Sequence, residues 1–290
     1  MQSMRIPFLG LTPVCVFLGM SVATANQANV SVLMLVLVLL GALLAHVSAN
    51  TLNEYYDFKS GLDFTTTRTR FSGGSGMLPR NPELAHIVFS LGIVSLISVV
   101  AIGGFFVWKH GLAIIPIGIT GLALVVTYTE RVNKHPLLCL IAPGIGFGFL
   151  MVVGTQFLLE GRYASLSWIV ALVPFFLVNN LLLLNQYPDI QADTRVGRYH
   201  FPIAYGTKNS NAVYAVFVLA SITVIVASIL TGYLPKLSLI ALLPMPLALF
   251  ALKGAIKYAD NIGNHPQYLG SNVAVAVLTP LLLGISIIVS

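Results

Sequence analysis

Residues 49–63 read ANTLNEYYDFKSGLD and close a long apolar run with polar side chains. Asn53 and Asp57 are four residues apart, so a helix that continues through them carries both side chains on one face. Asp63 follows Gly61, where we expect this helix to end. Carboxylates beside so long an apolar segment are costly, and they usually mark a functional site.

A second stretch, LLLLNQYPDIQADTRVGR at residues 181–198, repeats this arrangement and places Asn185 at another helix end. Hard ions such as Mg²⁺ take carboxylate oxygens, keep several waters and usually hold the phosphate oxygens of a substrate. A lone acid could simply end a helix at a membrane interface. Two acidic motifs together predict one shared divalent-metal site. Its expected catalytic and metal-binding residues are Asp57, Asp63, Asp189 and Asp193.

The composition indicates an integral membrane protein. Of the 290 residues, 57% are hydrophobic and only 8% are charged, and the mean hydropathy is +0.90. A soluble domain of this length carries about a quarter charged residues. Apolar runs of membrane-spanning length recur as far as Ser290, which leaves no room for a separate soluble domain. We therefore expect a single all-α transmembrane domain over residues 1–290.

The apolar runs predict nine transmembrane helices in a polytopic bundle. The expected ranges are 7–25, 30–56, 84–108, 111–129, 137–158, 165–187, 210–231, 235–252 and 268–289. The first run lacks a cleavage pattern and is expected to be a retained helix. An odd number of spans places the two termini on opposite sides of the membrane.

The distribution of charge predicts the orientation. With the N-terminus in the cytoplasm, twelve of the fifteen Lys and Arg residues fall on the cytoplasmic side, as the positive-inside rule requires. Eight of the nine acids fall on that side too, where the loops are also longer. We therefore expect a cytoplasmic cap of loops that carries the functional mouth, with the C-terminus on the opposite side. The net charge of +6 is then mainly a topology signal, so no nucleic-acid partner is expected, and no obligate protein partner is inferred.

Several residues near the two acidic motifs are candidates for substrate binding. The loop TTTRTRFSGGSGMLPRN, residues 65–81, surrounds a Gly-Gly-Ser-Gly turn with arginines that can bind phosphate in a bidentate fork. Basic residues are common in such loops, so the arginines alone do not predict phosphate binding. They do so because the acidic motif is adjacent. Tyr128 belongs to a set of aromatics near the same face, most of them interfacial, of which one or two could stabilise a cation. The expected substrate-binding residues are Asn53, Arg70, Arg80, Tyr128, Asn185, Arg198 and Lys208.

Other reaction classes find no support in the sequence. There is no GxxxxGK[ST], GxSxG or HExxH motif, and the six histidines show no pairing at ligand spacing. Cys15 and Cys139 lie far apart in apolar segments and are expected to be buried hydrophobes. One alternative is an ion-coupled transporter, in which membrane acids and asparagines bind Na⁺ or H⁺. The gathering of the acids at one face favours a metal-phosphate enzyme.

At its two motifs the chain resembles the UbiA superfamily of membrane prenyltransferases, which have nine transmembrane helices and two Asp-rich motifs. NEYYDFKSGLD followed by GGSGMLPR is similar to the first motif of the branch that prenylates 1,4-dihydroxy-2-naphthoate in menaquinone synthesis, where the second Asp follows the first by six residues. NQYPDIQADTRVGR resembles the second motif, and residues 146–161 resemble the fifth helix of the family. The chain departs from the family after Tyr128, where TERVNKHP replaces a Pro-rich basic turn followed by a Gly-Glu pair.

The resemblance implies a reaction between a polyprenyl diphosphate and an aromatic acceptor within the lipid bilayer. The four aspartates would hold Mg²⁺ with the diphosphate, while Arg70, Arg80 and Arg198 would take its remaining oxygens. Asn53 and Asn185 would orient carboxylates or water. Cleavage of the allylic C–O bond would give a cation that the acceptor ring attacks, after which a dihydroxynaphthoate would lose CO₂. Other acceptors of the family remain open: 4-hydroxybenzoate, homogentisate, a porphyrin-type ring and glycerol phosphate.

Overall fold

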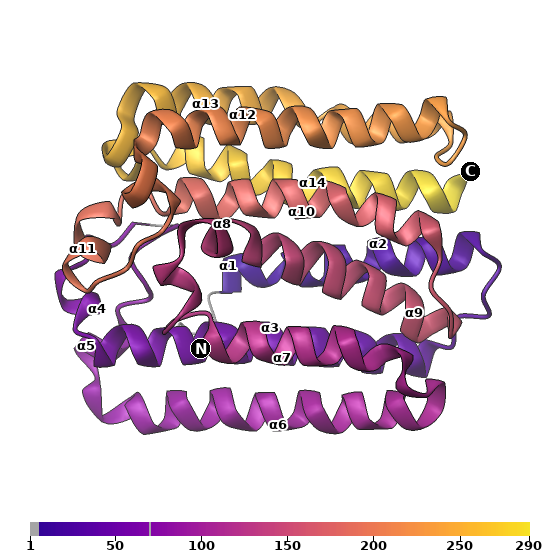
Figure 1. Ribbon diagram of the computed structural model, residues 1–290, viewed down its shortest axis with the longest axis horizontal. Helices are drawn as coiled ribbons and strands as arrows, with labels where there is room; N and C mark the ends of the chain where they lie inside the picture. Colours follow the sequence, from indigo (N-terminus) through magenta and orange to yellow (C-terminus); the bar gives the residue numbers. More distant parts are fainter. Residues whose placement is uncertain (1–5, 70) are drawn as a thin grey trace.

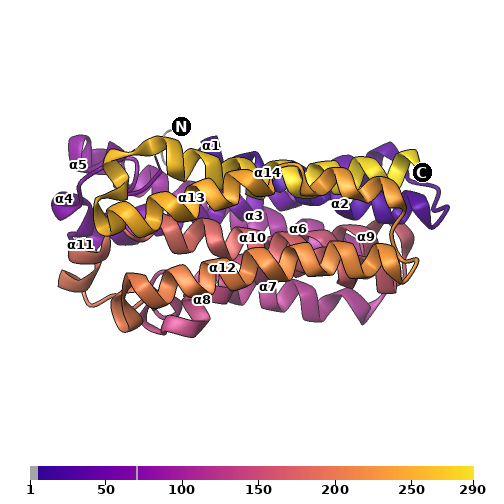
Figure 2. The same cartoon turned by 90° about the horizontal axis from the view of Figure 1, so that it is seen from above.

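The computed structural model describes residues 6–69 and 71–290, and over these two ranges the chain forms helices and no strand. The long helices run side by side along the long axis of the molecule (Figure 1), and they keep this direction when the bundle is seen from above (Figure 2). The predicted all-α class is thereby confirmed.

Long helices alternate along the chain with short helical turns. In chain order the helical segments are α1 (Ile6–Leu9), α2 (Leu11–Ala25), α3 (Val32–Lys59), α4 (Leu62–Thr65), α5 (Met77–Arg80), η2 (Pro82–Leu84), α6 (Ala85–His110), η3 (Leu112–Ile114), α7 (Ile115–Thr127), η4 (Val132–Lys134), α8 (Pro136–Gly144), η5 (Ile145–Val153), α9 (Gly154–Glu160), α10 (Ser165–Asn185), α11 (Ile190–Arg195), α12 (Phe201–Leu230), η6 (Lys236–Leu242), α13 (Met245–Tyr258), η7 (Ala259–Asn264) and α14 (Pro266–Val289).

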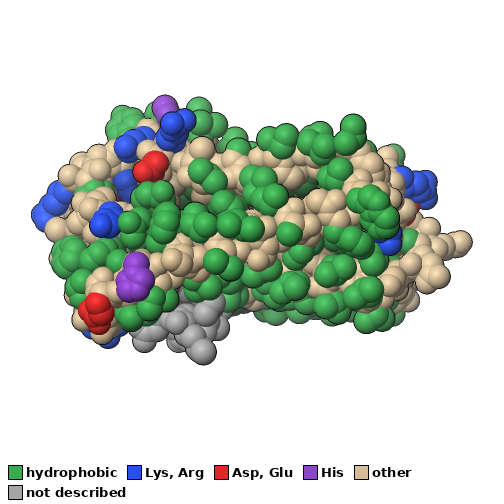
Figure 3. All heavy atoms as spheres, turned by 90° about the horizontal axis from the view of Figure 1, so that it is seen from below, with side chains coloured by type: hydrophobic (Ala, Val, Ile, Leu, Met, Phe, Trp, Pro, Cys, Tyr) green, Lys and Arg blue, Asp and Glu red, His purple; other side chains and the backbone are tan. Residues whose placement is uncertain are grey.

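Seven helical stretches among the described residues are long and apolar enough to cross a membrane. Two shorter apolar helical stretches, Leu11–Ala25 and Leu112–Thr127, accompany them. Figure 3 shows hydrophobic side chains along the middle of one face of the bundle, with charged side chains gathered toward the two ends. This distribution suits a bundle whose middle lies in lipid, and it confirms the prediction of a multi-pass membrane protein.

One predicted helix, 137–158, is a composite of three segments. A π-helical segment, η5, lies between α8 and α9 and follows Pro143, which lacks a backbone N–H. The side chain of Asn179 on α10 accepts a hydrogen bond from the backbone N–H of Gly144 at 2.6 Å. Gly144 and Gly148 also let this composite helix approach α10 closely, since an added Cβ would lie 2.4 Å and 2.6 Å from carbonyl oxygens of α10. Hydropathy alone indicates a span at these residues but not its irregular backbone.

Two other predicted ranges, 210–231 and 235–252, differ from the observed helices. In the first range α12 begins earlier, at Phe201, with a short helical segment in which Pro202 suits the first turn. Gly206 interrupts it with φ of +77°, a conformation that favours glycine. In the second range the chain forms the 3₁₀ segment η6, and the regular helix α13 then continues to Tyr258.

The connections at one end of the bundle build a cap. Figure 1 shows α4, α5 and α11 gathered at the end opposite the C-terminus. α4 and α5 follow α3, and α11 follows α10, so the two acidic motifs meet at this cap. The helix α3 ends at Lys59, and Gly61 follows with φ of +82°, close to the predicted end.

A closed loop of buried hydrogen bonds joins the helices α10, α12 and α14. Asn180 on α10 donates to the carbonyl oxygen of Tyr214 on α12 at 3.0 Å. The Tyr214 hydroxyl donates to Asn272 Oδ1 on α14 at 2.9 Å, and Asn272 Nδ2 donates to the carbonyl oxygen of Asn180 at 3.0 Å. Because apolar contacts between helices gain little in lipid, such polar contacts help to fix helix pairing.

We predict that Tyr214→Phe lowers the free energy of unfolding in micelles by about 1–2 kcal/mol, because Asn272 Oδ1 loses its buried donor. The measurement is reversible denaturation followed by circular dichroism. Tyr233→Phe is the matched control, since Tyr233 is exposed. Equal stability of the Tyr214→Phe protein and the wild type would contradict a stabilising role for the loop.

Candidate active site

A large cavity of about 480 Å³ connects the cap to the interior of the bundle. Its walls come from α3, α6, α7, the composite helix 136–160 and α10. Both acidic motifs line its mouth, and leucine, isoleucine, valine, phenylalanine and glycine residues line most of the rest. The cavity is therefore polar at the cap and apolar inside the bundle.

The helix α3 brings Asn53 and Asp57 to the cavity, as the four-residue spacing predicts. Asn53 Nδ2 donates to Asp57 Oδ2 at 2.9 Å, and Asn53 Oδ1 accepts from the Thr129 hydroxyl at 3.0 Å. Both polar ends of the Asn53 amide are used, so this side chain holds Asp57 in one orientation. Asp63 enters the cavity wall from the short helix α4 beyond the Gly61 turn.

The second motif reaches the same cavity from the end of α10. Asn185 is the last residue of this helix, Asp189 immediately precedes α11, and Asp193 lies on α11. All three line the cavity. The structure thus brings together two segments that are more than a hundred residues apart in sequence.

Arg198 joins the two motifs directly. Its Nη1 donates to Asp193 Oδ1 at 3.0 Å, and its Nη2 pairs with Asp57 Oδ1. Burial alone would lower the pKa of the Arg198 guanidinium, but Asp57 and Asp193 raise it, so the net pKa lies above its ordinary value. The sequence predicted a shared divalent-metal site at these acids, and the structure shows that a protein cation neutralises part of their charge.

The glycine-rich loop of the cap is tied to both motifs. Glu54 on α3 is fully buried, and its carboxylate accepts hydrogen bonds from the backbone N–H and the hydroxyl of Ser75. The backbone N–H of Gly73 donates to Asp189 Oδ2 at 3.1 Å. Gly74 must be glycine, because its φ is +70° and a Cβ would lie 2.7 Å from Asp63 Oδ1.

Two residues of this network were not predicted from the sequence. Glu54 stands between the residues of the first motif, yet it points to the loop and not to the cavity. His200 follows the second motif, and its Nε2 lies 3.0 Å from Asp193 Oδ2 inside the protein. In the sequence, Glu54 directly follows Asn53, and His200 lies seven residues after Asp193. Neither position tells whether the side chain is buried in the network or exposed at the surface.

A profile of the UbiA prenyltransferase family matches residues 12–265, which is most of the chain. The chain belongs to this family. Membership shows that this protein is a prenyl-transferring enzyme, and it sets aside the transporter alternative.

Individual relatives agree with this assignment. This UbiA family member is 28% identical to the 1,4-dihydroxy-2-naphthoate octaprenyltransferase of Bacillus subtilis. The match extends over 248 residues, which are 83% of this chain and 77% of that protein. Its fold is similar to the apo structure of a UbiA homologue from Aeropyrum pernix, with a TM-score of 0.72, 18% identity and 97% of each chain covered. The fold is also similar to a UbiA homologue from Archaeoglobus fulgidus bound to DMAPP and Mg²⁺, with a TM-score of 0.63, 17% identity, and 100% of this chain and 99% of that chain covered. The predicted cofactor is thus present in a solved member of the family.

The remaining predicted residues of this UbiA enzyme fall in different places. Tyr128 lines the cavity, and its hydroxyl lies 3.9 Å from Cys139 Sγ. Arg80 and Lys208 are exposed and do not belong to the described cavity wall. Arg80 Nε donates to the carbonyl oxygen of Gly76, and Lys208 follows the break in α12 at Gly206. Arg70 lies outside the described residues.

The donor set of the cavity mouth fits a hard divalent ion that is shared with a substrate. Carboxylate oxygens come from both motifs, and the buried Oδ1 of Asn185 has no hydrogen-bond partner among the described residues. Within the same part of the chain, no three His, Cys, Asp or Glu side chains gather closely enough to hold a metal by themselves. This arrangement suits Mg²⁺, which is usually bound by one or two carboxylates together with substrate phosphates.

We predict that Arg198→Leu destabilises the metal-free protein by about 3 kcal/mol, because two buried carboxylates lose their cation. The double variant Asp57→Asn/Arg198→Leu should recover at least half of this loss, since one of the charges is then removed. Thermal unfolding in EDTA measures both effects. Arg195→Leu is the control, because Arg195 is exposed on the neighbouring helix turn. Additive losses in the double variant would contradict the pairing.

Proposed function

We propose that this chain is an Mg²⁺-dependent prenyltransferase that moves a polyprenyl group from its diphosphate to an aromatic acceptor, with 1,4-dihydroxy-2-naphthoate as that acceptor. The observation that carries the proposal is the meeting of two acidic motifs at the polar mouth of one otherwise apolar cavity. A diphosphate head suits the mouth, and an isoprenoid tail suits the interior.

Asp57 and Asp63 from one motif, and Asp189 and Asp193 from the other, would hold Mg²⁺ and the diphosphate between them. Bound Mg²⁺ supplies Lewis-acid stabilisation of the departing diphosphate. Asn53 keeps Asp57 oriented, and His200 keeps Asp193 oriented. Arg198 lies between carboxylates of the two motifs, so its guanidinium would be placed to pair with diphosphate oxygens at the cavity mouth.

The apolar interior protects the reactive species. When the allylic C–O bond breaks, the electron pair leaves with the diphosphate and a carbon cation remains. Tyr128 lines the cavity, and its aromatic ring would be available to stabilise this cation. Leucine, isoleucine and phenylalanine walls keep away the water that would otherwise quench it.

The choice of acceptor rests on two supports. One is the relative in Bacillus subtilis that is named for octaprenyl transfer to 1,4-dihydroxy-2-naphthoate. The other is the six-residue spacing of Asp57 and Asp63, which resembles that branch of the family. Because the segment after Tyr128 departs from the family pattern, a second acceptor of the family, 4-hydroxybenzoate, belongs in the same assay.

We also propose a topology for the chain. The whole chain would act as one transmembrane domain with nine spans, in which the shorter helices around α2 and α7 join the seven longer stretches. The cap of α4, α5 and α11 would lie on the cytoplasmic side together with the N-terminus, and the C-terminus would lie opposite. The excess of Lys and Arg near the cap supports this orientation.

The proposed activity is tested by transfer of radiolabelled geranylgeranyl diphosphate in detergent micelles with Mg²⁺. 1,4-Dihydroxy-2-naphthoate and 4-hydroxybenzoate are offered in parallel, with an EDTA control. We expect label in the naphthoate product only, and only with Mg²⁺. Diphosphate binding without transfer to the naphthoate would overturn the acceptor, and the absence of any Mg²⁺-dependent diphosphate binding would overturn the proposed site.

We predict that Asp57→Asn and Asp189→Asn each reduce turnover more than about 100-fold, because each removes an anionic metal ligand from the transition state. Gel filtration and thermal unfolding should show folded proteins. Asp260→Asn serves as the control, since Asp260 is an exposed acid outside the cavity wall. Turnover near the wild-type rate in either motif variant would refute the site assignment.

A further inference from the structure

A second hollow of the molecule lies between the end of α3 and the start of α6. It is an open groove with a volume of about 400 Å³. Its polar and aromatic wall residues are Tyr55, Lys59, Glu83, His86, Phe89 and Ser90. None of these six residues belongs to the described wall of the central cavity. We call this hollow the α3–α6 groove.

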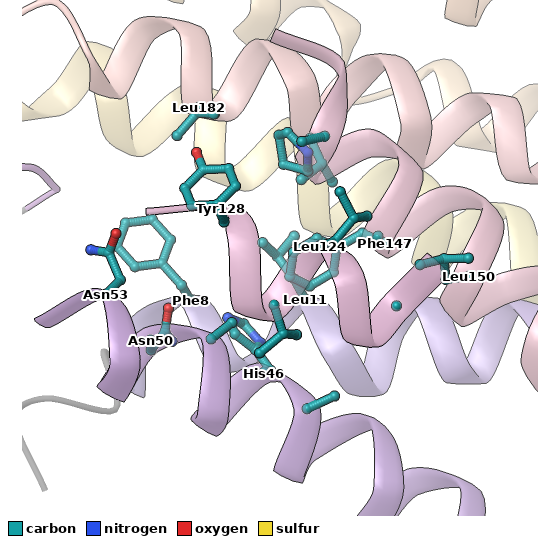
Figure 4. Close-up of a pocket in the computed structure, with 18 of the residues that line it drawn as sticks. Phe8, Leu11, His46, Asn50, Asn53, Leu124, Tyr128, Phe147, Leu150 and Leu182 are labelled. Carbon is teal, nitrogen blue, oxygen red and sulfur yellow. The ribbon is translucent and has the colours of Figure 1, made fainter. Parts of the chain in front are cut away.

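The helix α3 separates the α3–α6 groove from the candidate active site. In Figure 4, Asn50 and Asn53 lie on the side of α3 that faces the central cavity. With about 3.6 residues per turn, Tyr55 and Lys59 share one face of the helix, and that face points away from Asn53. The groove therefore opens on a different side of α3 from the mouth of the central cavity.

The α3–α6 groove lies at the depth where lipid headgroups are expected. α3 ends at Lys59, and the apolar stretch that contains α6 begins at Pro82. Ile97 and Val100 follow Ser90 by seven and ten residues, so they continue the groove along one face of α6, and both are exposed. A ligand at this place can keep a polar head in the groove and a hydrocarbon chain along α6.

The surface around α6 shows the same division. Figure 3 views the bundle from the side on which α6 lies in Figure 1. Basic, acidic and histidine side chains appear toward the cap end of this face, and hydrophobic side chains cover the stretch beyond them. This pattern fits a lipid whose head lies at the cap end and whose acyl chains lie along the helices.

The α3–α6 groove carries charges of both signs. Lys59 comes from α3, Glu83 from η2 and His86 from the first turn of α6. Within the part of the chain that the structure describes, none of these three side chains forms an ion pair. The Lys59 ammonium instead lies 5.7 Å from the centroid of the Tyr55 ring. Opposite charges that line one groove without pairing leave room for a group that carries both charges.

We infer that the α3–α6 groove binds the headgroup of a phospholipid that carries both a phosphate and a primary ammonium group, as phosphatidylethanolamine does. The Lys59 ammonium and the His86 imidazole donate to phosphate oxygens, and the Glu83 carboxylate accepts from the lipid ammonium. The rings of Tyr55 and Phe89, with centroids 4.8 Å apart, join α3 to α6 in the groove wall and so fix the spacing of these charged side chains.

The presence of both charges decides the class of lipid. Phosphatidylglycerol has no amine, so it places no positive charge opposite Glu83. Phosphatidylcholine carries a positive charge, but its trimethylammonium group has no N–H to donate. The competing explanation is that these side chains are solvated residues at a membrane interface, in which case the protein binds the three headgroups without preference. Lipid binding here is independent of the proposed prenyl transfer, because the groove and the central cavity are lined by different residues.

The test measures the affinity of the first bound lipid by native mass spectrometry of the delipidated full-length protein in detergent micelles. Dioleoyl phosphatidylethanolamine, phosphatidylglycerol and phosphatidylcholine are titrated separately, so that only the headgroup differs. We expect the ethanolamine lipid to bind about tenfold more tightly than the other two, because only its headgroup satisfies both the basic and the acidic side chains of the groove.

Two variants and two matched controls locate the binding site. Glu83→Gln should lose most of the preference for the ethanolamine lipid over the glycerol lipid, and Lys59→Gln should weaken binding of the ethanolamine lipid about tenfold. Glu130→Gln and Lys134→Gln are the controls, because these charged residues lie outside the groove, on the connection between α7 and α8. All four side chains are exposed, so each variant should unfold at the wild-type temperature in lipid-free micelles.

Each outcome decides the inference. A preference for the ethanolamine lipid that is lost in Glu83→Gln and kept in Glu130→Gln supports the site. Equal affinity of the wild type for the three lipids, or a preference for the glycerol lipid, overturns it. A preference that survives both Glu83→Gln and Lys59→Gln places the bound headgroup elsewhere on the protein and also overturns the site, as does an equal loss in the two controls.

Discussion

The central constraint on this protein is the placement of four carboxylates at the edge of an apolar bundle. Carboxylates in such a position repel one another and lose hydration, so they require cations. Arg198 supplies one cation, pairing with Asp57 from the first motif and Asp193 from the second. The cap is organised around this contact. Asn53 and His200 contact the two acids and orient them, and the hydrogen bonds of Ser75 to Glu54 hold the glycine-rich loop beside them.

The rest of the bundle encloses the cavity below the cap with mostly apolar side chains. Glycine residues at 144 and 148 let the composite helix pack tightly on α10, and the buried loop through Tyr214 joins α10, α12 and α14. In contrast, α7 contributes no buried residue of its own and lines the cavity with small and aliphatic side chains. One side of the bundle is thus closely packed, and the other encloses the apolar part of the cavity, where we propose that the isoprenoid tail lies.

Much of this arrangement follows from local sequence. Hydropathy is a property of each segment, so it predicted an all-helical membrane protein, and the spacing of Asn53 and Asp57 predicted a shared helix face. Contacts between distant residues could not be predicted in this way. The π-helical segment depends on Asn179 accepting from Gly144, and the buried Glu54 depends on a loop twenty residues later. Arg80 was favoured for its position near the glycines, but its side chain turns back to Gly76, a local contact that residue type and spacing do not encode.

The most direct test of the account is a titration with Mn²⁺, a spectroscopic substitute for Mg²⁺, followed by electron paramagnetic resonance with and without geranylgeranyl thiolodiphosphate. Because the two motifs are expected to hold metal only together with the diphosphate, tight Mn²⁺ binding should appear when the thiolodiphosphate is present. It should disappear in both Asp57→Asn and Asp189→Asn. Tight Mn²⁺ binding that needs no thiolodiphosphate, or that survives the loss of either aspartate, would contradict a single site shared by the two motifs.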